Sequence, residues 1–414
     1  MYRLSRPILV LFLLLVAALP AAAPAAAQIP WPPSGCQQGV LGTGAVWLIC
    51  MPERLGRVWN GDLVVYAHGY VSPIPDRPPE LPAEHYFLPD GASIPDMINS
   101  FGYAFATTSY RTNGLAIKFG VSDLVQLVNT FSSRHPSPSP HTYVVGASEG
   151  AVVTVKSIEE HPDIFSGGVA ACGPVGDFQK QVNYLGDFRV VFDRFFPGIL
   201  TGSAIEIPDS LIANWGLLQG VILNAMSNDP TAAAQLLNVM QAAVDGADPT
   251  SPGKTVLGAL WYNIFATNDA TAKLHGNPFD NWTRAYAGSG DDAALNAAVA
   301  RYKATRAAPS QIGNHLQTSG NLSRPLALVH NTLDPVVPFW HETLYAQKVG
   351  PSPYYMLLPV VRYGHCNFTS SEIMAAFQWA VVSAGGTPFA APEDALPSPE
   401  AVQRFLELTR DLRP

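Results

Sequence analysis

The stretch Thr142-Tyr143-Val144-Val145-Gly146-Ala147-Ser148-Glu149-Gly150 contains the strongest fold signal in this chain. Four residues with the composition of a buried strand lead into a Gly-x-Ser-x-Gly pentapeptide, and a helical stretch follows from Gly150 to Glu160. A serine between a strand and a helix must sit on a sharp turn with strained backbone angles, and the two glycines remove side chains that would collide there. The pattern predicts that Ser148 stands at the carboxyl end of a sheet as a nucleophile.

A serine hydroxyl is a poor nucleophile unless a histidine takes its proton and a carboxylate fixes the tautomer of that histidine. His365 directly follows a predicted strand over 354–361, and Asp334 follows a predicted strand over 325–330. One helix and one strand fill the interval between these two residues, so both should leave adjacent strand ends on the face where Ser148 emerges. We therefore predict a catalytic triad of Ser148, Asp334 and His365, with His365 as general base and acid.

Each of these residues also has a simpler structural explanation when it is taken alone. A Gly-x-Ser-x-Gly sequence can arise by chance in a glycine-rich chain, and an aspartate before a proline, as in Asp334-Pro335, is a common turn former. A histidine such as His365 can serve a surface or structural role. Their order along the strands favours the catalytic interpretation.

A serine hydrolase also needs two backbone amides to stabilise the negative oxygen of its intermediate. The amide of Glu149, directly after the nucleophile, is the first candidate. The second should come from the loop after the buried strand Leu63 to Ala67, where the sequence reads His68-Gly69-Tyr70-Val71. We predict that the Tyr70 amide is this second donor, and that His68 is structural or orients the loop.

From about Gly61 onward, short β-rich runs alternate with helical stretches, which indicates βαβ units and a mainly parallel sheet. After a strand over 167–171 the alternation of strands and helices stops, and it resumes only at the strand over 325–330. So long an interval is not a plain loop. We predict a helical cap over 176–320, inserted into a catalytic domain that comprises 28–175 and 321–414.

The chain resembles the α/β-hydrolase superfamily over roughly residues 45 to 385. The resemblance rests on the series His68-Gly69, Gly146-Ala147-Ser148-Glu149-Gly150, Leu333-Asp334-Pro335 and Gly364-His365. That resemblance implies an eight-stranded, mainly parallel sheet with flanking helices, no metal or cofactor, and an acyl-enzyme on Ser148 that water releases. The export signal described below, the His-Gly-Tyr loop and the cap are similar to bacterial secreted carboxylesterases, some of which accept polyesters. A small-molecule or polymeric ester is the substrate that this resemblance implies.

Two other functions compete with an esterase. A capped serine aminopeptidase of the prolyl type would share fold and triad, although the oxyanion loop of that family usually reads His-Gly-Gly-Pro-Gly, whereas this chain has His68-Gly69-Tyr70. A non-catalytic binding protein on the same fold is disfavoured by the full Ser, Asp, His series. The predicted cap offers several aromatic residues for an apolar pocket, but such residues more often form a core; they are Trp215, Trp261, Tyr262, Phe265 and Trp282.

The chain has four cysteines, which allow three pairings. Cys36 and Cys50 flank a glycine-rich turn and suit a local bridge across a hairpin, which leaves Cys172 and Cys366 as the second pair. Free buried thiols are the alternative, because spacing alone does not fix connectivity. The predicted strand order places Cys172 and Cys366 on the catalytic face, where a disulfide would tether the loop of His365 to the sheet.

The first residues indicate export. Arg3 and Arg6 precede an apolar run from Ile8 to Leu19, which is too short to span a bilayer, and small residues follow. We predict a signal peptide over 1–27, a secreted or periplasmic protein, and no stable membrane anchor after cleavage. The net charge of −8 argues against nucleic acid as a partner. The sequence leaves the oligomeric state open.

Overall fold

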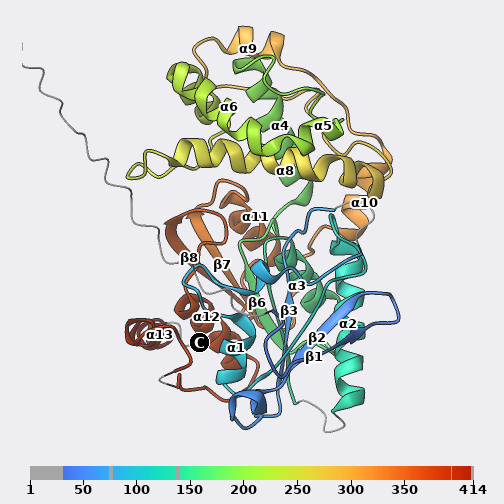
Figure 1. Cartoon of the computed structure of the whole chain (residues 1–414), viewed down its shortest axis with the longest axis vertical. Coiled ribbons are helices and arrows are strands. Elements are labelled where there is room, and N and C mark those ends of the chain that lie inside the picture. Colours follow the sequence, from blue (N-terminus) through green and yellow to red (C-terminus); the bar gives the residue numbers. More distant parts are fainter. Residues whose placement is uncertain (1–30, 74–77, 136–139, 393, 412–414) are drawn as a thin grey trace, which may run out of the picture.

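The computed structural model describes residues 31–73, 78–135, 140–392 and 394–411 (Figure 1). The predicted signal peptide over 1–27 and its cleavage site lie outside the described residues. No helix among the described residues combines the length and the apolar character that crossing a membrane requires.

One sheet of eight strands runs through the described chain in the order β1-β2-β4-β3-β5-β6-β7-β8. The strands are β1 Gln37–Val40, β2 Val46–Cys50, β3 Leu63–Ala67, β4 Ala104–Thr108, β5 Thr142–Ala147, β6 Gly167–Ala171, β7 Leu326–Leu333 and β8 Tyr355–Tyr363. β2 is antiparallel to both of its neighbours, and the strands from β4 to β8 pair in parallel. This mixed, mostly parallel sheet with its strand, turn and helix at Ser148 is an α/β-hydrolase fold, which confirms the predicted fold class.

Helices cover both faces of the sheet, as a parallel sheet requires. The side chains of β5 alternate between two cores, with Val144 in one and Tyr143 and Val145 in the other. Helices α2 (Ile117–Arg134), α3 (Glu149–Glu160) and α11 (Trp340–Val349) pack into the first core. Helices α1 (Ile94–Ser100), α12 (Ser370–Ser383) and α13 (Pro399–Asp411) pack into the second.

The chain leaves the sheet after β6 and returns at β7, although these two strands are paired neighbours. The intervening helices are α4 Phe178–Phe195, α5 Asp209–Ala213, α6 Trp215–Asn228, α7 Pro230–Val239, α8 Ser251–Lys273, α9 Asp292–Ala298 and α10 Ala307–His315. Figure 1 shows α4 to α9 together beyond the α11 end of the sheet, and these helices share a hydrophobic core of their own. We call α4 to α9 the cap.

Helix α10 differs from the rest of the predicted cap segment over 176–320. Its side chains Ala308 and Ile312 are buried in the core that α2 and α3 share with the sheet. Figure 1 accordingly places α10 beside the upper part of that layer rather than within the cap. The inserted segment is therefore anchored by its last helix to the core beside the sheet.

The N-terminal hairpin of β1 and β2 forms the edge of the sheet. Cys36 and Cys50 lie at its open end and are joined by a disulfide, with their Cα atoms 4.3 Å apart. Two short 3₁₀ helices, η1 (Pro52–Leu55) and η2 (Ala83–Tyr86), lie in the connections that follow β2 and β3. The disulfide ties the chain before β1 to the end of β2.

Candidate active site

Ser148 occupies the turn between β5 and α3 with backbone angles φ of 57° and ψ of −120°. A positive φ is uncommon for a residue with a side chain and marks local strain. The flanking glycines make the turn feasible, since a Cβ on Gly146 would lie 2.3 Å from the Gly150 carbonyl oxygen, and a Cβ on Gly150 would lie 2.0 Å from that of Ala67. The close approach of three backbone segments therefore fixes the position of Ser148.

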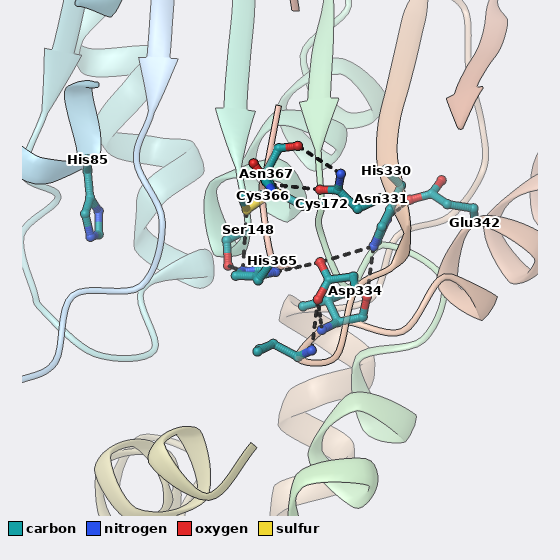
Figure 2. The surroundings of a disulfide bond; sticks show 12 residues. His85, Ser148, Cys172, His330, Asn331, Asp334, Glu342, His365, Cys366 and Asn367 are labelled. Atoms are coloured by element: carbon teal, nitrogen blue, oxygen red, sulfur yellow. Dashed lines mark hydrogen bonds and ion pairs between the residues drawn. A yellow bond between two sulfur atoms is a disulfide. The ribbon is translucent and has the colours of Figure 1, made fainter. Parts of the chain in front are cut away.

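His365 connects Ser148 to Asp334 (Figure 2). Its Nε2 lies 2.9 Å from Ser148 Oγ, and its Nδ1 lies 2.7 Å from Asp334 Oδ2. An ionised carboxylate can only accept, so Nδ1 carries the proton and Nε2 is free to receive the proton of Ser148. The structure thus brings together the three residues of the predicted triad, which come from the loops after β5, β7 and β8.

Asp334 is only 1% exposed and is held by its own turn. Its Oδ1 accepts hydrogen bonds from the amides of Val336 and Val337, each at 2.9 Å. Burial alone would raise the pKa of Asp334, but the attraction of His365, together with contacts to His330, lowers it to about 2. The carboxylate is therefore ionised at neutral pH, and both of its oxygens are engaged.

The loop that carries His365 is tied to the sheet at two points (Figure 2). Cys366 forms a disulfide with Cys172, which directly follows β6, and their Cα atoms are 5.3 Å apart. Asn331 of β7 donates a hydrogen bond from Nδ2 to the Asn367 carbonyl at 3.0 Å and accepts one from the Asn367 amide at 2.8 Å. These ties limit the motion that would misplace the His365 ring.

Cys172, His365 and Cys366 form the one group among the described residues whose side chains lie close enough to supply three metal ligands. Thiolates bind metals, whereas both sulfurs here are joined to each other in the disulfide. His365 is then the one remaining donor of this group, and it is already engaged with Ser148 and Asp334. The group is therefore a disulfide next to a hydrogen-bonded imidazole.

The two residues predicted to form the oxyanion hole flank Ser148. Glu149 is the first residue of α3, so its amide has no acceptor within the helix. On the other side, a Cβ on Gly69 would lie 3.3 Å from the Ser148 Cβ, which places the loop from His68 to Tyr70 directly against the nucleophile. His68 is buried and its Nδ1 donates to the Gly69 carbonyl at 2.7 Å, so it orients this loop.

The side chain of Glu149 has a separate structural contact. Its Oε1 accepts a hydrogen bond of 2.8 Å from the Ala116 amide at the start of α2. Burial raises the pKa of this carboxyl group to about 8. Glu149 is therefore mostly protonated at neutral pH, and its side chain anchors the first residue of α3 to the start of α2.

An apolar pocket opens beside Ser148 and Glu149, between the sheet and the cap. Side chains of α4 and α8 supply one wall, and the loops after β3, β4, β6 and β7 supply the others. The apolar and aromatic residues that line it are Tyr70, Leu115, Pro174, Phe178, Val182, Leu185, Tyr262, Ala266, Ala270, Val336 and Val337. Such a pocket suits an apolar group attached to the atom that Ser148 attacks.

Tyr262 of the cap helix α8 is a site residue that sequence reasoning did not select. Its ring lies 6.3 Å from that of His365 and 6.1 Å from that of Tyr70. Burial raises the pKa of Tyr262 to about 12, and an interaction with the Ser148 side chain opposes this rise. Helical spacing alone does not separate Tyr262 from its core neighbours, because the separation depends on how α8 lies over the sheet.

Comparison with known proteins finds distant structural likenesses. No protein-family model and no curated protein matches the chain. An esterase from Aspergillus oryzae is similar over 86% of this chain and 81% of its own, at 14% identity and a TM-score of 0.47. Feruloyl esterase B from Aspergillus oryzae is similar over 87% of this chain and 83% of its own, at 14% identity and a TM-score of 0.44. The Pyrococcus horikoshii acylaminoacyl peptidase is similar over 83% of this chain but 40% of its own, at 10% identity and a TM-score of 0.39.

Proposed function

We propose that this chain is a serine carboxylesterase that hydrolyses esters of apolar acyl groups through an acyl-enzyme on Ser148. The observation that carries the proposal is the hydrogen-bonded series from Ser148 through His365 to Asp334, which stands at an apolar pocket. A nucleophile, a base with a defined tautomer and a buried ionised acid are the parts that acyl transfer requires.

Acylation follows from this geometry. Ser148 Oγ attacks the ester carbonyl carbon while His365 Nε2 takes the hydroxyl proton, and Asp334 stabilises the imidazolium that forms. The carbonyl oxygen becomes negative and accepts hydrogen bonds from the amides of Tyr70 and Glu149. The tetrahedral intermediate collapses, the bond to the alcohol oxygen breaks, and His365 donates its proton to that oxygen.

Deacylation repeats these steps with water as the nucleophile. His365 Nε2 takes a proton from a water molecule, whose oxygen attacks the carbonyl carbon of the acyl group on Ser148. The same two amides stabilise the second oxyanion. The bond to Ser148 Oγ then breaks, His365 returns the proton to that oxygen, and the carboxylic acid leaves.

The pocket favours an ester over the substrate of an aminopeptidase. An aminopeptidase must bind an ammonium group, which requires an ionised carboxylate near the nucleophile. Glu149 is the one acidic residue among those that line the pocket, and burial raises its pKa to about 8. Because its Oε1 already accepts from the Ala116 amide, the pocket offers little negative charge to a substrate.

A substrate panel tests this proposal. The substrates are nitrophenyl butyrate, a long-chain nitrophenyl ester, a polyester emulsion and an aminoacyl anilide. Each is incubated with the wild type, with Ser148→Ala and with the control Ser132→Ala, which alters an exposed serine of α2. We expect hydrolysis of the nitrophenyl esters by the wild type and Ser132→Ala, with a loss of about 1000-fold or more in Ser148→Ala. Faster cleavage of the anilide, or full ester hydrolysis by Ser148→Ala, would contradict it.

We also propose that residues 1–27 direct export of the chain. Two disulfides among the described residues support this, because disulfides persist mainly in oxidising compartments. Expression of the full chain in a bacterial host, followed by N-terminal sequencing of the protein outside the cytoplasm, should give Gln28 as the first residue. An uncleaved chain that stays in the cytoplasm would overturn the proposal.

A further inference from the structure

His330 of β7 lies behind the triad, fully buried between two carboxyl groups (Figure 2). Its Nδ1 is 2.6 Å from Glu342 Oε1 of α11, and its Nε2 is 2.8 Å from the Val337 carbonyl oxygen. Asp334 Oδ2 lies 3.6 Å from the same Nε2, which is the range of an ion pair rather than of a hydrogen bond. Both ring nitrogens therefore face oxygen atoms.

This arrangement restricts the protonation of the ring. A carbonyl oxygen can only accept, so Nε2 must carry a proton toward Val337. The short contact of Nδ1 with Glu342 is typical of a charge-assisted hydrogen bond, and the ionised Asp334 nearby favours a positive ring. Burial alone would lower the pKa of His330, but its contacts with Asp334 and Glu342 raise it to about 10.

We propose that His330 is a charged imidazolium, paired with Glu342, that acts as a positioning residue for the triad by holding the Asp334 carboxylate in place and ionised. The kinetic part of this inference rests on the proposed esterase function, whereas the charge of His330 does not. His330 touches neither Ser148 nor the pocket, so it acts through Asp334.

Val337 shows how His330 positions Asp334. The Val337 carbonyl accepts the hydrogen bond from His330 Nε2, and the Val337 amide donates to Asp334 Oδ1 at 2.9 Å. One peptide segment is thus fixed by His330 on one side and fixes the triad carboxylate on the other. A change at His330 would loosen the turn that orients Asp334 toward His365.

The charge of the ring also balances the buried acids. When His365 takes the proton of Ser148, the ionisable side chains behind the reacting atoms are two cations, His365 and His330, and two anions, Asp334 and Glu342, while the oxyanion of the substrate faces the amides of Tyr70 and Glu149. Without the positive His330, two buried carboxylates would share a single cation, which is unfavourable in a low-dielectric interior. The pair of His330 and Glu342 therefore lets Asp334 remain ionised throughout the cycle.

The other titratable groups around this pair are neutral. His341 Nδ1 accepts from the amides of Gly176 and Asp177 at 3.2 and 3.3 Å, so its single proton is on Nε2, and burial lowers its pKa well below the ordinary value. Tyr345 and Tyr355 interact with Glu342, and burial raises the pKa of both phenols above the ordinary value. Asp334 and Glu342 are thus the acidic groups that His330 faces.

Nuclear magnetic resonance of the full mature chain, labelled with ¹⁵N-histidine, tests the charge directly. The spectrum of His330→Gln assigns the His330 signals, and His341 serves as an internal control with one ring proton. We expect protons on both ring nitrogens of His330 from pH 6 to pH 8. A single ring proton at pH 7, with the second proton on Glu342 instead, would overturn the proposal even if the enzyme hydrolyses esters.

The kinetic test uses His330→Gln, Glu342→Gln and the double variant, all assayed with nitrophenyl butyrate. We expect kcat/KM to fall about tenfold in each single variant, because each leaves an unbalanced charge beside Asp334. In Glu342→Gln the alkaline decline of activity should begin at a lower pH, since His330 loses the carboxylate that holds its proton. The double variant should lose less than the product of the two single losses.

Wild-type kcat/KM in both single variants across pH 6 to 10, or single losses that simply multiply in the double variant, would contradict the positioning role. If the wild type hydrolyses no ester, the proposed function fails and the kinetic test does not apply. The resonance experiment still decides the charge of His330 in that case. The two failures are therefore distinguishable.

Discussion

The Ser148 hydroxyl has two polar neighbours from different parts of the molecule. His365 contacts it from the end of the sheet at 2.9 Å, and Tyr262 of the cap lines the same pocket beside it. The hydroxyl can donate to only one partner, and the histidine nitrogen is an acceptor, so the Tyr262 phenol is left to act as a donor. A donor at this point can stabilise negative charge as it develops on the substrate.

Replacement of Tyr262 by Phe tests this role at the scale of one atom. The variant keeps the ring that packs against His365 and Tyr70 but loses the hydroxyl group. We expect kcat for nitrophenyl butyrate to fall about tenfold, with little change in the melting temperature. Tyr302→Phe, which removes a half-buried phenol elsewhere in the cap segment, is the control. An equal loss in both variants would show that the Tyr262 hydroxyl has no special role.

At the scale of elements, three loops at the carboxyl ends of the strands must keep their relative positions. The Cys172 to Cys366 disulfide joins the loop after β6 to the loop of His365, whereas the Cys36 to Cys50 disulfide lies at the edge of the sheet. Their sequence separations are 194 and 14 residues. By chain entropy these separations correspond to about 5 and about 3 kcal/mol of stability.

Removal of each disulfide separates its effect on activity from its effect on stability. Assayed at 25 °C, Cys172→Ala with Cys366→Ala should lower kcat about tenfold, because the His365 loop gains mobility. Cys36→Ala with Cys50→Ala should lower the melting temperature but leave kcat within about twofold. Circular dichroism first establishes that each variant is folded at the assay temperature. Unchanged kcat in the first variant would argue against the tether.

The elements that carry the triad could be predicted because their signals are local. A buried run enters the turn at Ser148, and single strand ends precede Asp334 and His365. The start of α2 could not be predicted correctly. The spacing of apolar residues indicates a helix from about Val121, whereas α2 begins at Ile117. The Ala116 amide is satisfied by the Glu149 carboxyl group of another helix, and this tertiary contact has no trace in the local sequence.

The supporting residues of the site, Tyr262 and His330, could not be predicted from the sequence for a related reason. Tyr262 belongs to a helix that is aromatic on more than one side, and only the way the cap lies over the sheet selects one ring. His330 looks like any core histidine of a strand until Glu342 of α11 is placed beside it. Both roles depend on packing between elements that are far apart in sequence.

At the scale of the whole molecule, two buried groups make stability depend on pH in the same direction. Burial raises the pKa of Glu149 to about 8 in the folded chain, whereas its pKa in the unfolded chain is about 4.5. The contacts with Asp334 and Glu342 raise the pKa of His330 to about 10 in the folded chain, whereas its pKa in the unfolded chain is about 6.5. The folded state thus holds more protons than the unfolded state, so stability falls as the pH rises between these values.

The melting temperature of the wild type should therefore decrease between pH 6 and pH 9. Glu149→Gln keeps the acceptor for the Ala116 amide but cannot ionise, so its decrease should be smaller by about 3 °C. Glu160→Gln changes a more exposed carboxyl group on the same helix and should follow the wild type. Identical pH slopes for the wild type and Glu149→Gln, measured by scanning calorimetry, would refute this assignment.

The central claim is that Ser148 is a nucleophile activated by His365 and Asp334. Reaction of the folded protein with a fluorophosphonate, followed by mass spectrometry of the intact chain and its peptides, tests it most directly. We expect one phosphonyl group on Ser148 in the wild type and in Ser132→Ala, none in Ser148→Ala, and much slower labelling in His365→Ala. Folded wild type without the label, or a label that persists in Ser148→Ala, would contradict the claim.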